Sequence, residues 1–305
     1  MSCSSGNYEL RDWSRDKDKI KVLATTAMIG DLAKEVGGEE VHVLILIKGD
    51  LDPHSYQLVK GDDEKLSFAD IIFANGLQLE HGPSLQHYLE NHDKVHFLGN
   101  KLLNFNPSPL LNYKGQVDPH IWMDLSLFAQ TLPVIVEGLS KVRPEKKVYF
   151  AERGKKLEET LLKAHEKVRH ILAQVPSEKR YLVTSHDAFN YFARAYLADE
   201  GESDWQNRFA APEGLAPESL LSTKNISDIL DHVKKYRIRV IFPESNVSTD
   251  SLRKIQNAAK EEGLEITLGN PYLYGDAMGP PGSDGDTYLK MIEHNAKTIA
   301  EDING

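Results

Sequence analysis

The sequence predicts an α/β protein of two lobes, each a mostly parallel sheet flanked by helices, joined by one long rigid helix. Short β-branched apolar runs alternate with helical patterns, this alternation occurs twice, and one uninterrupted helical pattern separates the two occurrences. A chain of 305 residues also exceeds the usual size of one domain. We therefore expect four segments: a flexible N-terminal linker at 1–19, a first lobe at 20–143, the connecting helix at 144–176 and a second lobe at 177–305.

Strands of the first lobe are expected where apolar runs of four to eight residues are rich in β-branched or aromatic side chains. These runs are 21–26, 41–47, 68–75 and 95–99. Helical patterns at 28–36 and 85–89 fill intervals between them. Alternating strands and helices imply βαβ units, and therefore a parallel sheet.

The connecting helix is expected to begin at Pro144, a favoured first-turn residue, and to end before Pro176. Its apolar positions recur at spacings of three, four and seven, which indicates one buried stripe. These positions are Phe150, Leu157, Leu161, Ala164, Val168, Ile171 and Val175. A helix of this length spans roughly 45 Å, and its stiffness should restrict the lobes to small tilts. Gly154 is the weakest position of this helix, because glycine lowers helix stability by about 1 kcal/mol relative to Ala.

The second lobe repeats the pattern of the first. Strands are expected at 180–185, 239–243 and 265–268, and helices at 188–197, 226–237, 248–261 and 287–303. Ser248 and Thr249 offer an N-cap to the third of these helices, and Gly263 offers its C-terminal stop.

Composition and charge limit the class of protein. With 40% hydrophobic and 27% charged residues the chain is typical of folded proteins. A net charge of -10 argues against general nucleic-acid binding, and we find no run of about 18 apolar residues that would span a membrane. Cys3, the one cysteine, cannot form an internal disulfide; it is either a lipid-attachment residue or an incidental thiol in a frayed terminus.

Three of the twelve histidines stand in a context that suits metal binding. His54 and His120 each end an Asp-Pro-His tripeptide, in which proline holds the imidazole in a loop. His186 stands where an expected strand gives way to a helix, at the edge of a parallel sheet where ligands bind. Eight others are interpreted as structural: His42, His87, His92, His96, His165, His170, His232 and His294.

A carboxylate is expected beside these imidazoles. Imidazoles suit zinc, iron, copper and nickel, and a carboxylate extends the range toward manganese. Asp276 is the best candidate because it lies in a glycine-containing loop between the last expected strand and the last helix. Asp284 and Asp286 are alternatives in a segment typical of a solvated turn, where Asp286 suits an N-cap.

Four further side chains are candidates for supporting roles. Glu244 is either a partner that orients a ligand imidazole or a surface carboxylate. His81 is a weaker candidate for the lining of the ligand cleft. Trp122 and Tyr56, beside His120 and His54, are expected to shield the site.

Five segments together carry a family resemblance. These are 52–56, 118–122, 184–189, 214–218 and Asp276. They resemble, in order and over about residues 20–304, the metal-binding solute receptors of bacterial ABC importers for zinc, manganese and iron. Within that family the Cys-Ser-Ser start and residues 212–215 are most similar to the chlamydial iron- and manganese-associated member.

The resemblance implies two lobes joined by a rigid helix, with one divalent transition metal ion (Mn, Fe or Zn) held between them. It implies His54 and His120 from the first lobe, and His186 and Asp276 from the second, as ligands. It also implies a monomeric receptor in the periplasm or on the outer face of the cytoplasmic membrane, with a membrane permease as partner. The long His/Asp-rich loop of zinc-dedicated relatives does not follow His54, which weakens a zinc-specific role.

The expected function is capture and transport of the ion without catalysis. Four protein ligands leave no committed position for an activated water. Histidines must be neutral to ligate a metal, so the metal affinity should decrease as the pH drops through their pKa range. We find no His-Glu-x-x-His, Gly-x-Ser-x-Gly or phosphate-loop motif. The alternatives are a surface lipoprotein or adhesin with a structural metal and, less favoured, a zinc hydrolase.

Overall fold

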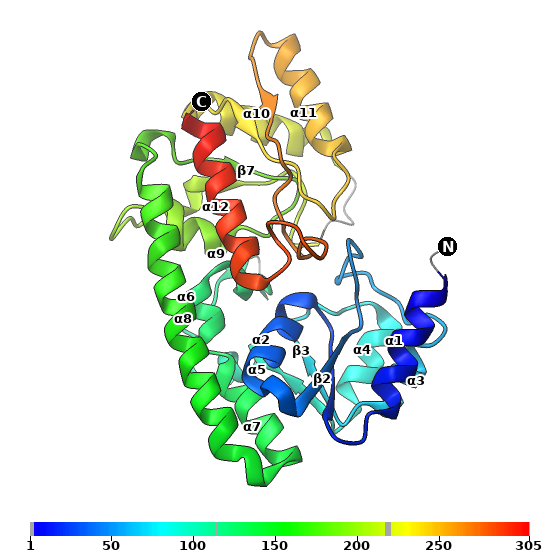
Figure 1. The fold of residues 1–305 in the computed structure, drawn as a ribbon. Helices are drawn as coiled ribbons and strands as arrows, with labels where there is room; N and C mark the ends of the chain where they lie inside the picture. Colours follow the sequence, from blue (N-terminus) through cyan, green and yellow to red (C-terminus); the bar gives the residue numbers. More distant parts are fainter. Residues whose placement is uncertain (1–2, 114, 217–220, 305) are drawn as a thin grey trace. The chain divides into compact units, whose positions relative to one another are not determined.

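The chain forms two compact units (Figure 1). The structure, a computed structural model, describes residues 3–113, 115–216 and 221–304. Unit 1 comprises Met1–Leu110 and Ser126–Leu162, and unit 2 comprises Leu111–Leu125 and Lys163–Gly305. Pro217 and Glu218, which belong to a segment that carries the family resemblance, lie outside the described residues.

Unit 1 contains the four-stranded parallel sheet that the sequence predicts, in the order β2-β1-β3-β4. Its strands are β1 (Ile20–Ala24), β2 (Val41–Ile45), β3 (Ile71–Ala74) and β4 (Val95–Phe97). The expected strand at 68–75 begins late because α3 (Asp62–Phe68) extends into it, and the N–H of Ala69 donates to the carbonyl of Lys65. The strand order places β1 in the interior of the sheet, between β2 and β3.

Helices cover both faces of this sheet (Figure 1). Leu23, Leu44 and Ile72 lie side by side in the register and form one buried cluster with residues of three helices. These helices are α1 (Cys3–Arg15), α3 and α4 (Pro83–Glu90). The opposite face packs against α2 (Ala27–Gly37) and α7 (Leu132–Val142). The short helix α5 (Leu98–Phe105) follows β4.

Helix α1 corrects the expectation of a flexible linker at 1–19. Leu10 and Trp13, three residues apart on this helix, pack against the buried cluster of unit 1. The Trp13 indole is 0% exposed, and its N–H donates to the carbonyl of His42 at 2.8 Å. Two apolar residues in a short, otherwise polar segment give little periodicity, so sequence alone did not reveal the helix.

The long helix that joins the two units is confirmed. A 3₁₀ turn, η3 (Pro144–Lys146), leads into α8 (Lys147–Ala173), which belongs to unit 1 up to Leu162 and to unit 2 beyond it. The buried stripe is as expected except near its end, where Leu172 is buried and Ile171 only partly so. Gly154 also has a packing role, because a Cβ there would lie 2.6 Å from Cγ2 of Val136 on α7.

The strands of unit 2 are shorter than expected. Parallel pairs join β7 (Leu182–Val183) to β8 (Phe209–Ala210), and β9 (Val240–Ile241) to β10 (Thr267–Leu268). The N–H of Phe242 donates to the carbonyl of Val183 at 2.8 Å, which links the two pairs. The pair β5 (Asn112–Tyr113) and β6 (Gln116–Val117) is antiparallel. Strands β5, β6 and β8 were not predicted.

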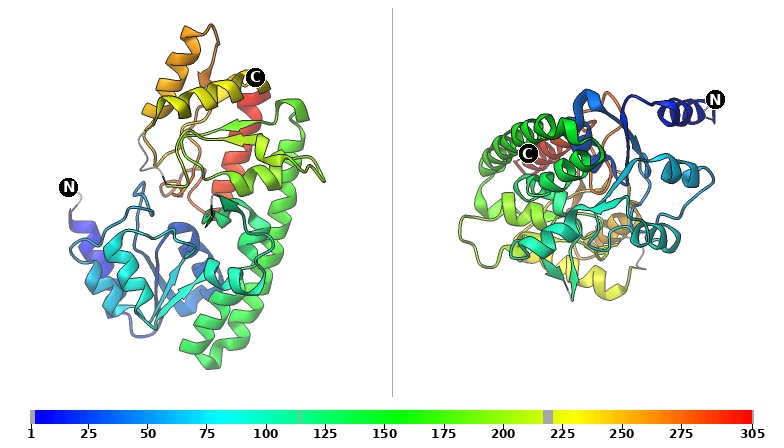
Figure 2. Two further views of the ribbon diagram at one scale, coloured as in Figure 1. Left: turned by 180° about the vertical axis from the view of Figure 1, so that it is seen from behind. Right: turned by 90° about the horizontal axis from the view of Figure 1, so that it is seen from below.

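The helices of unit 2 lie where the sequence predicts them. They are α10 (Thr223–Tyr236), α11 (Asp250–Glu261) and α12 (Tyr288–Asn304), together with α9 (Asn190–Phe192), which continues as a π-helical turn, η5 (Ala193–Leu197). Gly263 has φ +76° and follows α11 as the expected stop. Figure 2 shows α12 (red) beside α8 (green), where Lys167 Nζ lies 2.7 Å from Glu293 Oε2.

Residues 111–125, which the expected first lobe included, pack with unit 2. Three tyrosine hydroxyls of unit 2 bond to this segment. The Tyr191 hydroxyl accepts from the N–H of Leu111 and donates to the carbonyl of Asp118. The other two are Tyr196, which accepts from the N–H of Leu125, and Tyr288, which donates to the carbonyl of Trp122.

One stretch of the described chain, residues 125–142, is long and apolar enough to cross a membrane by composition. It includes α6 (Leu125–Ala129) and α7, and 56% of it is buried inside the protein. Burial of this kind is typical of a core helix, as the packing of α7 on the sheet indicates.

The packing of α1 predicts a strong effect of its tryptophan on stability. Trp13→Ala should lower the free energy of unfolding by about 3–5 kcal/mol, because it removes a fully buried ring and leaves a cavity. Tyr8→Ala on the same helix is the control, since Tyr8 is 75% exposed. Urea unfolding followed by circular dichroism measures both, and equal stability of the two variants would contradict the docked position of α1.

Candidate metal centre

Three of the four predicted ligands converge in unit 2. His120 Nε2 lies 3.5 Å from Asp276 Oδ1, and His186 Nε2 lies 3.1 Å from Asp276 Oδ2. The two imidazole centroids are 5.4 Å apart. Candidate ligand atoms of the three residues all lie within 4.8 Å of one another. An ion placed among them would meet two nitrogens and one carboxylate.

The Asp-Pro-His tripeptide forms the same turn in both of its copies. Asp118 Oδ1 accepts from the backbone N–H of His120 at 3.0 Å, and Asp52 Oδ1 accepts from that of His54 at 2.9 Å. The carboxylate thereby closes a short loop over the proline, which fixes the backbone of the histidine. In unit 2 the same Asp118 oxygen also lies 2.6 Å from Nδ1 of His120. The tripeptide pattern alone did not predict this second role of Asp118.

Glu244 holds the second imidazole in the same way. His186 follows β7, and its backbone N–H donates to Glu244 Oε1 at 2.9 Å. Its Nδ1 lies 2.7 Å from Glu244 Oε2. A Cβ on Gly275 would lie 2.3 Å from that oxygen, so glycine is required next to Asp276. Of the two interpretations of Glu244, the geometry supports the partner of a ligand imidazole.

These carboxylates determine which nitrogen of each imidazole is available to a metal ion. A neutral imidazole that donates its Nδ1 proton to a carboxylate keeps a lone pair on Nε2. In His120 and His186 it is Nε2 that lies beside Asp276. The pattern is typical of metal-ligating histidines, whose other nitrogen is usually bonded to a carboxylate or carbonyl.

The centre is buried and rich in negative charge. His120, His186, Asp118 and Asp276 are each at most 4% exposed. Burial alone would lower the pKa of His186, but the carboxylates of Glu244 and Asp276 outweigh it and raise that pKa well above its usual range. Burial, and then the charge of Asp118, raise the pKa of Asp187 to about 6. Such a site stabilises a cation.

The loop of Asp276 is held from two sides. The Trp122 indole N–H donates to the carbonyl of Gly275 at 3.0 Å, and Asn246 Oδ1 accepts from the N–H of Asp276 at 3.4 Å. Trp122 also stands edge-on to the His120 imidazole, with centroids 5.2 Å apart, which agrees with its expected shielding role.

The alternative carboxylates occupy the turn before α12. Asp286 accepts from the N–H of Gly282 at 2.9 Å and pairs with Lys290 at 2.8 Å. Asp284 is exposed. Both observations agree with the interpretation of this segment as a solvated turn.

The remaining candidates lie in unit 1. His54 follows β2 and is 2% exposed, and its imidazole centroid lies 5.6 Å from that of His81. The Tyr56 hydroxyl donates to Asp62 Oδ2 at 2.8 Å, and its ring belongs to the buried cluster of the unit. Tyr56 therefore supports the fold around the His54 loop.

Comparison with known proteins identifies the family. The chain matches, over residues 22–302, the family described as zinc-uptake complex component A, periplasmic. The chain belongs to this family. The metal-binding protein YtgA of Chlamydia trachomatis serovar D is 34% identical over 314 residues, which cover 100% of this chain and 94% of that protein. The manganese-binding lipoprotein MntA of Bacillus subtilis is 31% identical, with 93% and 89% covered.

Solved structures of the family confirm the fold. The crystal structure of Fe(III)-bound YtgA from Chlamydia trachomatis matches with a TM-score of 0.87 and 34% identity, and covers 93% of this chain and 98% of that one. The periplasmic zinc-binding protein TroA from Treponema pallidum matches with a TM-score of 0.82 and 30% identity, with 92% and 98% covered. Members of the family are metal-binding transport receptors and not enzymes, as the sequence predicts.

The contact between Glu244 and His186 predicts a loss of affinity in Glu244→Gln. Removing the charge from the partner of a ligand imidazole should weaken zinc binding by about 10–100-fold. Glu265→Gln is the matched control, because Glu265 is exposed at the surface of the same unit. Competition with a zinc-sensitive chelating dye measures both dissociation constants. If Glu244→Gln had the same zinc dissociation constant as the wild type, this carboxylate would have no effect on metal binding.

Proposed function

We propose that this protein is an extracytoplasmic solute-binding receptor that captures one divalent transition-metal ion, manganese, iron or zinc, and delivers it to the membrane permease of an ABC importer. Its place is the periplasm or the outer face of the cytoplasmic membrane. The buried cluster of His120, His186 and Asp276 carries this proposal, because both imidazoles are already oriented by carboxylates. Family membership supports the transport role.

His54 is the proposed fourth ligand. It stands in the same Asp-Pro-His turn as His120 and is nearly as buried. With His54 the set comprises three imidazole nitrogens and one carboxylate, a donor set that suits zinc and iron and extends to manganese. The proposed domains are two metal-binding lobes with the connecting helix at 144–176, and residues 111–125 are assigned to the second lobe.

The proposed donor set accommodates all three metals. The related YtgA, MntA and TroA are described as binding Fe(III), manganese and zinc, respectively. A site of this composition follows the general order of first-row affinities, in which zinc exceeds iron and manganese whatever ion is carried in the cell. Metal analysis of protein purified from its native envelope identifies the cargo.

Two finer features complete the proposal. We infer a lipid anchor at Cys3, since the relatives MntA and the PsaA of Streptococcus mitis are named lipoproteins. We also infer that the receptor acts as a monomer, because one chain supplies the whole proposed ligand set.

The proposed ligand set predicts that His120→Ala abolishes tight metal binding and leaves the fold intact. The change removes one of the nitrogen donors, while the Tyr191 and Tyr288 hydroxyls still anchor the segment through backbone groups. His170→Ala is the control, because His170 is exposed on α8 and its Nδ1 lies 2.7 Å from the backbone carbonyl of Glu166 on the same helix. Isothermal titration measures affinity and circular dichroism checks the fold; undiminished affinity in His120→Ala would refute the assignment.

A transport receptor and a lipoprotein with a structural metal differ in what happens on metal removal. The receptor should stay folded when a chelator strips its ion, and adding metal back should raise the midpoint of thermal unfolding by mass action. A structural metal site should unfold on chelation. A chelator titration followed by circular dichroism separates the two, and loss of the helical signal at stoichiometric chelator would favour the structural role.

A further inference from the structure

We propose that His81 and His54 form a two-imidazole capture site in unit 1, which binds the metal ion first and passes it to the ligands of unit 2. This inference rests on the proposed function. It concerns an additional ligand and an order of binding, which the four-ligand set does not include.

The spacing of the two imidazoles suits a shared ion. The centroids of His54 and His81 are 5.6 Å apart with 58° between the ring planes. The corresponding values for His120 and His186 are 5.4 Å and 71°. Since a ligating imidazole nitrogen lies about 2.0–2.1 Å from zinc, both pairs can place one nitrogen of each ring on the same ion.

His81 has the tautomer that a metal ligand needs. Its Nδ1 lies 3.1 Å from the carbonyl oxygen of Gln78, which can only accept a hydrogen bond. Nδ1 therefore carries the proton, and the lone pair is on Nε2. Bonding of the second nitrogen to a backbone carbonyl is a common way to orient a ligating histidine.

The loop that carries His81 is built around a buried carboxylate. Glu80 is 5% exposed, and its side chain accepts from the N–H of Asn75 at 2.7 Å, the N–H of Gly76 at 3.0 Å and the hydroxyl of Thr25 at 2.6 Å. These bonds fasten the loop to the ends of β1 and β3. The neighbouring imidazole is therefore held in place by the core of the unit.

The same loop contains backbone strain. Leu77 and Gln78 have φ +53° and +64°, in the left-handed region that non-glycine residues rarely adopt. The side chain of Asn100 accepts from the N–H of Leu77 at 2.7 Å and stabilises this conformation. Strain of this kind is retained where the surrounding structure enforces it, and it is concentrated at functional sites. Here it shapes the turn whose carbonyl orients His81.

The loops of His54 and His81 are in direct contact. They follow β2 and β3, which flank β1 in the sheet. A Cβ on Gly82 would lie 2.0 Å from the carbonyl oxygen of Tyr56, so glycine is required for this close approach. The separation of the two imidazoles is thus determined by backbone packing as well as by side-chain rotamers.

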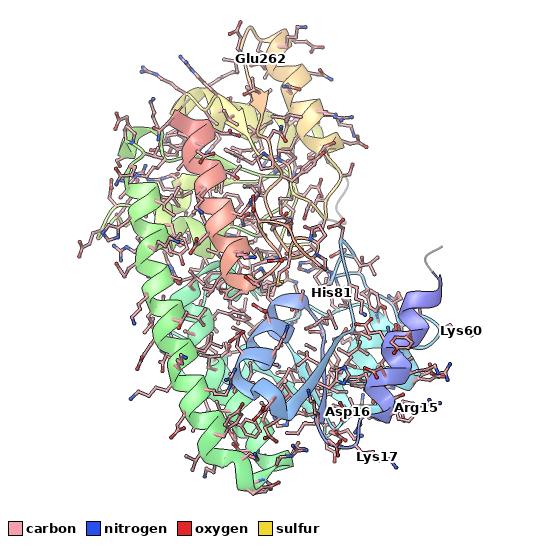
Figure 3. All side chains as sticks on the ribbon, in the orientation of Figure 1. Arg15, Asp16, Lys17, Lys60, His81 and Glu262 are labelled. Atoms are coloured by element: carbon pink, nitrogen blue, oxygen red, sulfur yellow. The ribbon has the colours of Figure 1, made fainter. Side chains whose placement is uncertain are left out.

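The two histidines differ in access to solvent. His54 is 2% exposed, whereas His81, labelled in Figure 3, is partly exposed. An ion arriving from water would meet the exposed imidazole before the buried one. Two imidazoles alone bind divalent ions more weakly than the full set of four ligands, so transfer to that set is favourable.

Association kinetics of Zn²⁺ test the capture step. His81→Gln should lower the association rate constant about tenfold, while the control His87→Gln, at a histidine of α4 in the same unit, leaves it unchanged. Stopped-flow mixing with a zinc-sensitive dye measures both rates, and a titration checks that the equilibrium affinity of His81→Gln changes less than its rate. Equal association rates for wild type and His81→Gln would overturn the proposal.

A copper experiment separates this proposal from the proposed function. In His120→Asn/His186→Asn, electron paramagnetic resonance of bound Cu²⁺ should show two nitrogen ligands, and adding His81→Gln should remove that signal. If the double variant binds zinc as tightly as wild type, the proposed function is wrong. If it loses tight binding but shows no two-nitrogen copper signal, only the capture site is wrong. Should the double variant not fold, the association rates decide.

Discussion

The metal centre depends on the pairing of buried carboxylates with the Nδ1 atoms of two imidazoles, Asp118 with His120 and Glu244 with His186. A buried carboxylate is costly unless it is hydrogen bonded. Here Asp118 accepts from the ring and the backbone N–H of His120, and Glu244 accepts from the backbone N–H of His186 and lies 2.7 Å from its Nδ1. The ring, its rotamer and its tautomer are thereby fixed together. Asp276 then lies beside the two remaining nitrogens, and the group as a whole stabilises a cation.

Contacts around this centre hold the segment of His120 in a fixed position. Hydroxyl groups of Tyr191, Tyr196 and Tyr288 bond to main-chain atoms of the segment that carries His120. Burial raises the pKa of Tyr191, and the charge of Asp118 adds to that effect, so the hydroxyl keeps its proton and can donate to the Asp118 carbonyl. A loop that would otherwise be free is therefore fastened at three points of unit 2.

Local signals in the sequence revealed most of the fold and the ligand residues. β-Branched runs located all four strands of unit 1, and the repeated Asp-Pro-His tripeptide indicated two histidines whose local turn the structure explains. Glu244 was identified as a candidate partner of a ligand imidazole, but the sequence did not indicate which one, because Glu244 lies 58 residues from His186. The bond of Tyr288 to Trp122 was missed, because these residues lie 166 positions apart and no periodicity relates them. Helix α1 was not predicted because it is stabilised by Trp13, which contacts the distant strand β2.

The path of the chain has a consequence for any attempt to divide the molecule. The backbone crosses from one unit to the other at three places, after Leu110, Leu125 and Leu162. Neither unit is a contiguous piece of polypeptide, so a fragment that starts at Lys163 contains His186 and Asp276 but lacks His120. If two receptors exchanged gene fragments at the middle of the connecting helix, the resulting metal site would combine ligands from two different proteins. Receptors of this architecture are therefore expected to diversify by substitution within an intact chain, and not by shuffling of halves.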